Sequence, residues 1–162
     1  MNRYNPHVLI LPEDQADREL AIGFLLEVDS ARRRQVRILP NAGGWREVVT
    51  RFNIDEAGKM RDYVERFIIL LVDFDNKIER LNEVRVQIPD DLKDRVFILG
   101  ALGEPEDLSK AGLGSGETIG TNLAKDCREN TDALWDHDLL RHNAGELDRL
   151  RKTVRPILFE SL

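Results

Sequence analysis

Acidic residues in this sequence stand directly after two apolar runs, and their spacing suits the binding of a divalent cation. Glu13 follows the first run and Asp17 comes one helical turn later, while Asp73 and Asp75 follow the most apolar stretch of the chain. Residues two apart in an extended segment point the same way, so we expect Asp73 and Asp75 to face one point together. Carboxylates this close repel each other unless a cation lies between them. Oxygen ligands favour Mg²⁺ or Mn²⁺ over zinc, so the pattern predicts a magnesium or manganese site.

Four short apolar runs predict the strands that would bring these acids together. They are rich in branched residues, as strands buried on both faces of a parallel sheet are, and they cover His7–Leu11, Gln35–Leu39, Phe67–Val72 and Arg95–Leu99. Segments with helical spacing of apolar residues separate them, which gives the order β-α-β-α-β-α-β of a doubly wound sheet. Ligands of such sheets bind beyond the carboxyl ends of the strands, where Glu13 and the Asp73/Asp75 pair should meet.

The remaining segments predict helices, and we expect a single domain over residues 1–162. Between the strands, helices are expected from Asp14 to about Val28, from Trp45 to a break around Asn53–Asp55, and from Lys77 to about Val84. After the break, a second helix is expected to run through Met60, Tyr63 and Val64. After the last strand, helices are expected over about 117–130, 131–140 and 144–154, and Arg155–Phe159 is either a fifth, edge strand or an anchored tail. The predicted fold class is three-layer α/β/α with a four- to five-stranded, mainly parallel sheet. Its core covers about 7–108 and a helical extension covers about 109–162.

The composition indicates a folded protein and narrows the environment in which it works. Of the 162 residues, 41% are hydrophobic and 33% are charged, the balance of an ordinary globular domain. No apolar run approaches the roughly 20 residues that a membrane-spanning helix needs, and the first residues lack the layout of a signal peptide. The single cysteine, Cys127, cannot form an internal disulfide, so we expect a cytoplasmic protein. The net charge of −6 argues against a nucleic-acid surface over the whole protein but allows a small basic groove.

Helix capping is the alternative explanation for each acid taken singly. An acid at the end of a strand often caps the next helix and lies at the positive end of its dipole. Asp14 could cap the first helix, and Asp75, which precedes Asn76, could cap the helix after the third strand. On this interpretation the chain is a non-catalytic interaction module. The joint placement of Glu13 and the aspartate pair at one sheet edge favours the metal site.

The arrangement resembles the Toprim family, the magnesium-binding module of topoisomerases, primases and OLD-type nucleases. Toprim domains have a glutamate after the first strand and an Asp-x-Asp pair after the third, which Glu13 and Asp73-Phe74-Asp75 match. Small stand-alone and nuclease-like members often have Glu-Gly-x-x-Asp at the first site. This chain keeps the two acids, Glu13 and Asp17, with Asp14 in place of the glycine. Gly43-Gly44 matches the Gly-rich turn that these relatives tend to have after the second strand.

The Toprim resemblance implies metal-assisted hydrolysis of phosphodiester bonds in nucleic acid. Glu13, Asp73 and Asp75 would be the catalytic residues and would hold Mg²⁺ or Mn²⁺, while Asp17 and Glu106 would serve a second ion. The metal would activate water and neutralise the charge that builds on the phosphate. Small relatives often work with another subunit, so a protein partner is expected beside nucleic acid.

Two further positions enter through the same resemblance. The acidic patch that follows the fourth strand in Toprim relatives could correspond to Glu104 or to Glu106. Lys77, close after the aspartate pair, is the candidate for a cation that helps the metal at the phosphate. Nuclease activity therefore stays an expectation that depends on how these side chains meet in the fold.

A second resemblance is to the receiver domains of response regulators. Glu13-Asp14 resembles the acidic pair of a receiver, and Asp73 would be its phosphorylated aspartate. Receivers have Ser or Thr where this chain has Gly100 or Ala101, and a Lys-Pro after the fifth strand that is absent here. The three hypotheses predict different sites. A metal enzyme needs an ion bridging Glu13 and the aspartate pair, an interaction module has acids satisfied by caps or an arginine, and a receiver has a solitary exposed Asp73.

Overall fold

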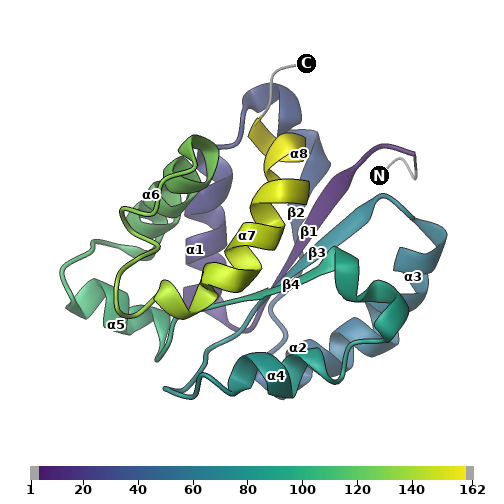
Figure 1. The fold of residues 1–162 in the computed structure, drawn as a ribbon, viewed down its shortest axis with the longest axis horizontal. Helices are drawn as coiled ribbons and strands as arrows, with labels where there is room; N and C mark the ends of the chain where they lie inside the picture. The colour runs from purple at the N-terminus through teal and green to yellow at the C-terminus, as the bar shows by residue number, and fades with distance from the viewer. Residues whose placement is uncertain (1–3, 160–162) are drawn as a thin grey trace.

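The computed structural model describes residues 4–159 and has a four-stranded, all-parallel sheet at its centre (Figure 1). The strands are β1 (His7–Pro12), β2 (Val36–Ile38), β3 (Arg66–Leu71) and β4 (Val96–Leu99), in the order β2-β1-β3-β4. The central strands β1 and β3 pair along their whole length, so that Pro12 lies opposite Leu71 at the carboxyl edge. Each strand begins and ends within one residue of its predicted range, and the predicted α/β class with a parallel sheet is confirmed.

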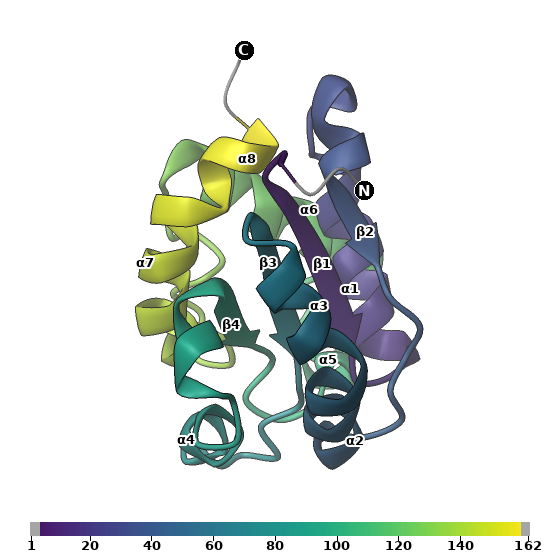
Figure 2. The ribbon, with the colours of Figure 1, turned by 90° about the vertical axis from the view of Figure 1, so that its right-hand side faces the viewer.

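Helices cover both faces of the sheet, which gives the three predicted layers (Figures 1 and 2). One face is covered by α1 (Gln15–Leu26), α6 (Gly116–Glu129), α7 (Ala144–Thr153) and α8 (Arg155–Phe159). The other is covered by α2 (Trp45–Arg51), α3 (Ala57–Asp62) and α4 (Arg80–Arg85). Successive strand residues point to opposite faces, so Val8 and Ile10 belong to one core while Leu9 and Leu11 belong to the other.

Shorter helical segments complete the chain. They are the 3₁₀ helices Ser30–Gln35, Asp90–Arg95 and Arg141–Asn143, the π-helical segment Phe52–Glu56, and α5 (Pro105–Lys110), which follows β4. None of the helices in the described part of the chain is long and apolar enough to cross a membrane.

α1 and α6 pack so closely that each has a glycine at the contact. A Cβ atom on Gly120 would lie 2.0 Å from the carbonyl oxygen of Leu20, and one on Gly23 would lie 2.0 Å from that of Glu117. A larger residue at either position would force the helices apart, because protein interiors leave no room for it. This contact fixes α1, the helix that begins beside the carboxyl edge of the sheet.

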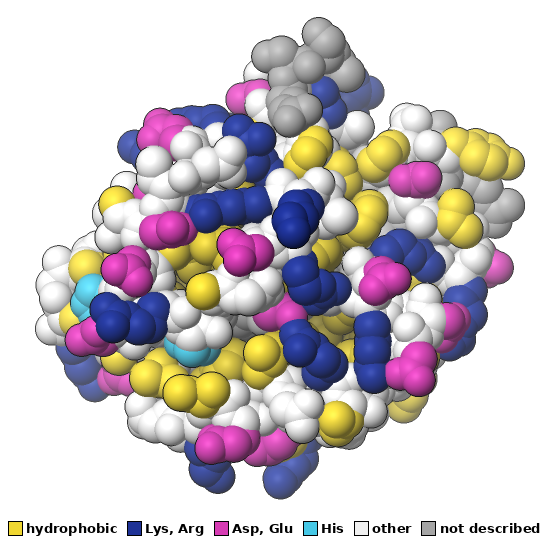
Figure 3. Space-filling model, in the orientation of Figure 1, with side chains coloured by type: hydrophobic (Ala, Val, Ile, Leu, Met, Phe, Trp, Pro, Cys, Tyr) yellow, Lys and Arg dark blue, Asp and Glu magenta, His cyan; other side chains and the backbone are white. Residues whose placement is uncertain are grey.

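Side chains from the start of α7 cover the outer edge of β4. Glu146 Oε2 accepts a hydrogen bond from the Ile98 N–H at 3.0 Å. Asn143 Oδ1 accepts from the Gly100 N–H at 3.1 Å, and Asn143 Nδ2 donates to the Gly100 carbonyl at 3.0 Å. These side chains form hydrogen bonds with backbone N–H and C=O groups that an open sheet edge would leave unpaired. On the face of the molecule that Figure 3 shows, Lys and Arg side chains lie among Asp and Glu side chains.

Three segments differ from the sequence prediction. Residues 131–140 form turns rather than a helix, because Asn130 ends α6 in the left-handed conformation (φ 54°) and the buried carboxylate of Asp126 accepts from Thr131 Oγ1 and the Leu134 N–H. Arg155–Phe159 forms α8 with Ile157, Leu158 and Phe159 buried, so the edge strand is wrong and the alternative, an anchored tail, agrees with the structure. The expected break near 53–55 is a π-helical segment that joins α2 directly to α3.

Candidate metal centre

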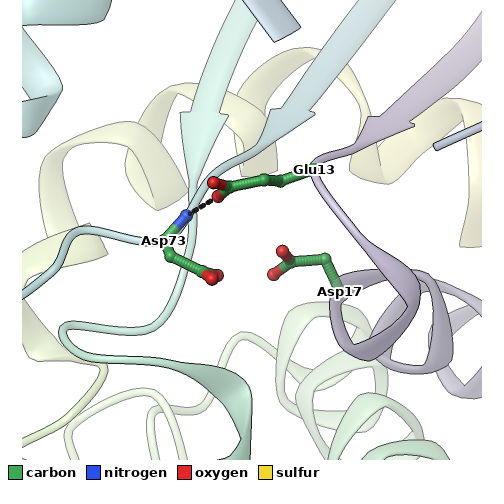
Figure 4. A group of neighbouring side chains, drawn as sticks. All are labelled: Glu13, Asp17 and Asp73. Carbon is green, nitrogen blue, oxygen red and sulfur yellow. Dashed lines mark hydrogen bonds between the residues drawn. The ribbon is translucent and has the colours of Figure 1, made fainter. Parts of the chain in front are cut away.

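Three acidic side chains meet at the carboxyl edge of the two central strands. Glu13 directly follows β1, Asp73 lies two residues beyond β3, and Asp17 lies in the first turn of α1. One carboxylate oxygen from each lies within 4.8 Å of those of the other two (Figure 4). The register of β1 and β3 brings Glu13 and Asp73 side by side, as the sequence predicts. Asp17 belongs to the same group, whereas the Toprim resemblance gave it to a second ion.

Backbone hydrogen bonds hold Glu13 and Asp73 in place. The Asp73 N–H donates to Glu13 Oε2 at 2.5 Å, so the side chain of Glu13 is fixed to the backbone of Asp73. The Glu13 N–H donates to the Leu71 carbonyl at 3.0 Å, which extends the pairing of the two strands beyond their ends. The Gly43 N–H donates to the Glu13 carbonyl at 2.7 Å. Gly43 has a φ of 108°, a conformation that L residues rarely adopt, so the Gly-rich turn predicted after β2 has a structural role at this edge.

Asp17 is the most deeply buried of the three acids, and no donor in the described chain reaches its carboxylate. Its exposed fraction is 0%, and neither oxygen accepts a hydrogen bond from the described residues. Its polar neighbours are the carboxyl groups of Asp73 and Asp14, which can share a hydrogen bond with it only while one of the two carboxyl groups is protonated. Its side chain points toward Asp73, of which Oδ1 is likewise buried and without a partner in this part of the chain (Figure 4). The predicted cap Asp14 fixes the backbone beneath it, since Asp14 Oδ1 accepts from the Asp17 N–H at 3.1 Å. Capping therefore explains Asp14 but leaves the side chain of Asp17 unexplained.

Burial raises the pKa of all three carboxyl groups. For Asp17 burial is the largest cause, and the negative charges of Asp73 and Asp14 raise its pKa further. Burial is also the main cause for Asp73, whose pKa is raised to about 7. Burial raises the pKa of Glu13 as well, against the hydrogen bond from the Asp73 amide, which lowers it. Without a cation, the group therefore holds protons at pH values where free carboxyl groups have lost them.

The sequence analysis expects Asp75 to face the same point as Asp73, and the backbone turns away from the extended conformation on which this expectation depends. Asp75 and Asn76 both have positive φ, 51° and 62°, so the segment is no longer extended and residues two apart no longer point the same way. The Asp75 carboxylate, 50% exposed, instead forms an ion pair with Arg80 at 2.9 Å. The structure therefore does not bring Asp75 into the group of three acids.

The acids after β4 also lie outside this group. Glu106 is exposed in the first turn of α5, where an acid is favoured by the helix dipole. Glu104 is the N-cap of α5 and forms a capping box with Asp107. Both positions therefore have a structural explanation, and the structure places neither beside Glu13, Asp17 and Asp73.

The cation beside the site is Arg80 rather than Lys77. Lys77 is exposed, whereas Arg80 is 4% exposed and its Nη1 donates to the Asp73 carbonyl and to Asp75 Oδ2, each at 2.9 Å. Sequence reasoning missed Arg80 because it follows Asp73 by seven residues across an irregular loop. Its helix is also too short for a periodic pattern to show which side chain turns inward.

No protein-family model, curated protein or solved structure matches this chain. The Toprim and receiver resemblances therefore stay predictions from the sequence. What the site can do follows from its own donor set. Three neighbouring carboxylates, of which Asp17 and Asp73 have buried oxygens without a hydrogen-bond partner in the described chain, could hold a metal ion. Oxygen ligands of this kind suit hard divalent cations such as Mg²⁺ or Mn²⁺ better than softer, nitrogen- or sulfur-seeking metals.

Proposed function

We propose that this protein is a Toprim-like, Mg²⁺- or Mn²⁺-dependent phosphoryl-transfer protein of the nuclease type, or a subunit of one, that acts on nucleic acid. The ion would be held by Glu13, Asp17 and Asp73. The observation that supports it best is Asp17, a fully buried carboxyl group whose two oxygens have no hydrogen-bond partner in the described chain. A buried acid without partners destabilises a fold by several kcal/mol unless it is neutral or bound to a cation. A divalent ion would supply the missing partner.

The chain's own residues would prepare this site before a substrate arrives. Glu13 and Asp73 are held to each other through the Asp73 amide, so two ligands need little rearrangement. Arg80 places a permanent positive charge beside them, which suits a phosphate group. A bound divalent ion would activate water for attack and neutralise charge on the phosphate. Phosphodiesters of nucleic acid are the substrate class that the Toprim resemblance implies.

The two alternatives account for less of the site. A receiver needs an exposed aspartate that can accept a phosphoryl group, whereas Asp73 is only 7% exposed. A non-catalytic interaction module needs acids that caps or an arginine satisfy. That describes Asp14 and Asp75, which have such partners, and leaves Asp17 unexplained.

Calorimetric titration of Mg²⁺ and of Mn²⁺ into the metal-free protein tests the proposal. We expect one strong site per chain in the wild type. Asp17→Asn and Asp73→Asn should each weaken it at least about tenfold, because each removes one charged oxygen ligand from a hard cation. Asp148→Asn, which changes an exposed aspartate of α7, is the matched control and should bind as the wild type does.

The outcome of the titration decides the next step. Site-specific binding that depends on Asp17 and Asp73 would justify assays of single- and double-stranded DNA and RNA with the same variants. Absence of binding up to several millimolar metal, or equal binding by all variants, would contradict the proposal and favour an interaction module.

A further inference from the structure

Arg80 is a buried cation that contacts both loops around the proposed ion. Its side chain is 4% exposed, and it stands at the start of α4, the helix that follows the loop of Asp73. Arginine is buried only where several groups hold its guanidinium. Resting on the proposed function, we infer that Arg80 is the positioning residue of the metal centre, which orders the ligand-bearing loops without binding the ion itself.

The first contact clamps the backbone of Asp73. Arg80 Nη1 donates to the Asp73 carbonyl at 2.9 Å, while the Asp73 N–H donates to Glu13 Oε2 at 2.5 Å. The peptide groups on both sides of the Asp73 Cα are therefore held, one by a cation and one by another ligand. Because the backbone on both sides is fixed, the direction in which the Asp73 carboxylate leaves the chain is fixed as well.

The second contact joins this loop to the loop after β2. The Arg80 guanidinium lies over the ring of Trp45, 4.3 Å from its centroid. Trp45 opens α2 directly after Gly43 and Gly44, and the Gly43 N–H donates to the Glu13 carbonyl at 2.7 Å. Arg80 therefore connects two segments that each hold Glu13, one through its side chain and one through its backbone. A stacked, planar guanidinium can make this connection, whereas a lysine ammonium cannot make the same contacts.

The third contact keeps a fourth carboxylate out of the ligand group. Asp75 Oδ2 accepts from Arg80 Nη1 at 2.9 Å, and the left-handed backbone at Asp75 and Asn76 turns the chain toward Arg80. The Asn76 N–H donates to the Leu102 carbonyl at 2.6 Å, which ties this turn to the loop after β4. The charge of Asp75 already acts on Glu13 and Asp73 from this position, and the pair with Arg80 offsets it and keeps the carboxylate from moving closer to the three acids.

The contacts of Arg80 with its own helix are weak. Arg80 Nε is buried and has no hydrogen-bond partner within the described chain, and it lies 3.7 Å from Glu83 as an ion pair. The contacts that define the position of Arg80 are therefore the hydrogen bonds of Nη1 to the loop of Asp73 and the stacking of the guanidinium on the ring of Trp45. Its own helix contributes only the weak pair with Glu83.

The inference is tested with Arg80→Met and Arg80→Lys, and with Trp45→Leu for the stacking contact. In folded protein, Arg80→Met should bind Mg²⁺ at least about tenfold more weakly than the wild type, because Asp73 loses its clamp. Arg80→Lys should recover part of the loss, since it keeps the charge and not the planar contacts. The Mg²⁺ affinity of Trp45→Leu should lie between that of Arg80→Lys and that of the wild type. Arg61→Met, which removes an arginine from the exposed ion pair with Asp91, is the matched control and should leave the affinity unchanged.

A measurement without metal separates this inference from the proposed function. Amide hydrogen exchange in the metal-free wild type and in Arg80→Met reports how firmly the loop is held, and the Asp73 amide should exchange about tenfold faster in the variant. Amides of β1, measured in the same samples, should be unaffected. If the wild type bound no metal, the proposed function would fail while the exchange data still decided the role of Arg80. Unchanged exchange at Asp73, or unchanged metal affinity in folded Arg80→Met, would overturn the positioning role.

Discussion

Two buried carboxylates in this molecule, Glu146 and Asp17, have opposite surroundings. Glu146 on α7 is 2% exposed and is surrounded by donors. It forms ion pairs with Arg85 and with Arg149, the latter at 2.9 Å, and it accepts from the Ile98 N–H at 3.0 Å. Asp17 on α1 is 0% exposed, and neither of its carboxylate oxygens has a partner among the described residues.

The difference separates a structural acid from a candidate ligand. The partners of Glu146 are complete within the chain, and their role is to close the edge of β4 against α7. The surroundings of Asp17 are incomplete, because its neighbours at the site are Asp73 and Glu13, which have the same charge. Burial alone therefore does not indicate function at an acidic residue. An incomplete set of partners does, since it is stable only with a proton or a cation.

The largest effect on stability is expected at the partnered acid. Glu146→Leu leaves Arg85, Arg149 and the Ile98 N–H without their shared acceptor. The free energy of unfolding should fall by about 3 kcal/mol, the low end for a broken buried ion pair, because both arginines are partly exposed and can turn to solvent. Urea unfolding measures this loss of free energy. Asp148→Leu, on the same helix, is the control that shows the effect of the same type of substitution at an exposed acid. A loss below about 1 kcal/mol would mean that the edge contacts are not what holds α7 on β4.

At the unpartnered acids the expected signature is a dependence on pH. Burial raises the pKa of Asp73 to about 7 in the folded protein, whereas an unfolded aspartate has a pKa of about 3.9. The folded state therefore holds this proton more tightly. The stabilising contribution of the proton is complete below about pH 4, falls as the pH rises, and is lost once the pH has passed through about 7. In EDTA, the wild type should lose about 2–3 kcal/mol of unfolding free energy between pH 5 and pH 8 through this group, because each pH unit between the two pKa values changes that free energy by about 1.4 kcal/mol.

Asp73→Asn should reduce that pH dependence by the share of Asp73, because the amide has no proton to lose, while burial still raises the pKa of Asp17 and of Glu13. In the wild type, saturating Mg²⁺ should restore the unfolding free energy that is lost at pH 8, since a ligand that binds only the folded state stabilises that state. The readout is the unfolding free energy at both pH values, with and without the ion. A metal-free wild type that is as stable at pH 8 as at pH 5 would show that the acids already have partners.

The strands and the meeting of two candidate ligands, Glu13 and Asp73, could be predicted because they depend on local pattern, whereas Asp17 was predicted for a second ion and lies in the same group. The branched apolar runs of β1 and β3 are legible in the sequence, and parallel strands place Glu13 and Asp73 at one edge by geometry alone. The capping role of Asp14 is equally local. The helix expected over 131–140 failed because a tertiary contact, the buried Asp126, takes the N–H groups that a helix would use.

The rest of the site depends on contacts that no periodic pattern encodes. Arg80 is recognisable only once the loop after β3 is folded and the ring of Trp45 lies beneath the guanidinium. Asp75 was assigned from extended geometry, and two consecutive left-handed residues that are not glycine are not foreseen from that pattern. The burial of Asp17 depends on how closely α1 packs, which the sequence shows only through Gly23 and Gly120.

The smallest expected effect, at Asp75, tests whether the comparison of partnered and unpartnered acids holds within the site itself. Asp75 lies as close in sequence to Asp73 as a ligand could, yet it has a partner in Arg80 and is half exposed. Asp75→Asn should change the Mg²⁺ affinity by less than about threefold and the unfolding free energy by less than about 1 kcal/mol, because exposed ion pairs contribute little. The amide oxygen can still accept from Arg80, so the clamp on Asp73 should survive. A loss as large as that of Asp17→Asn would mean that Asp75 leaves Arg80 when the ion binds, and partnering in the metal-free protein would then no longer identify the ligands.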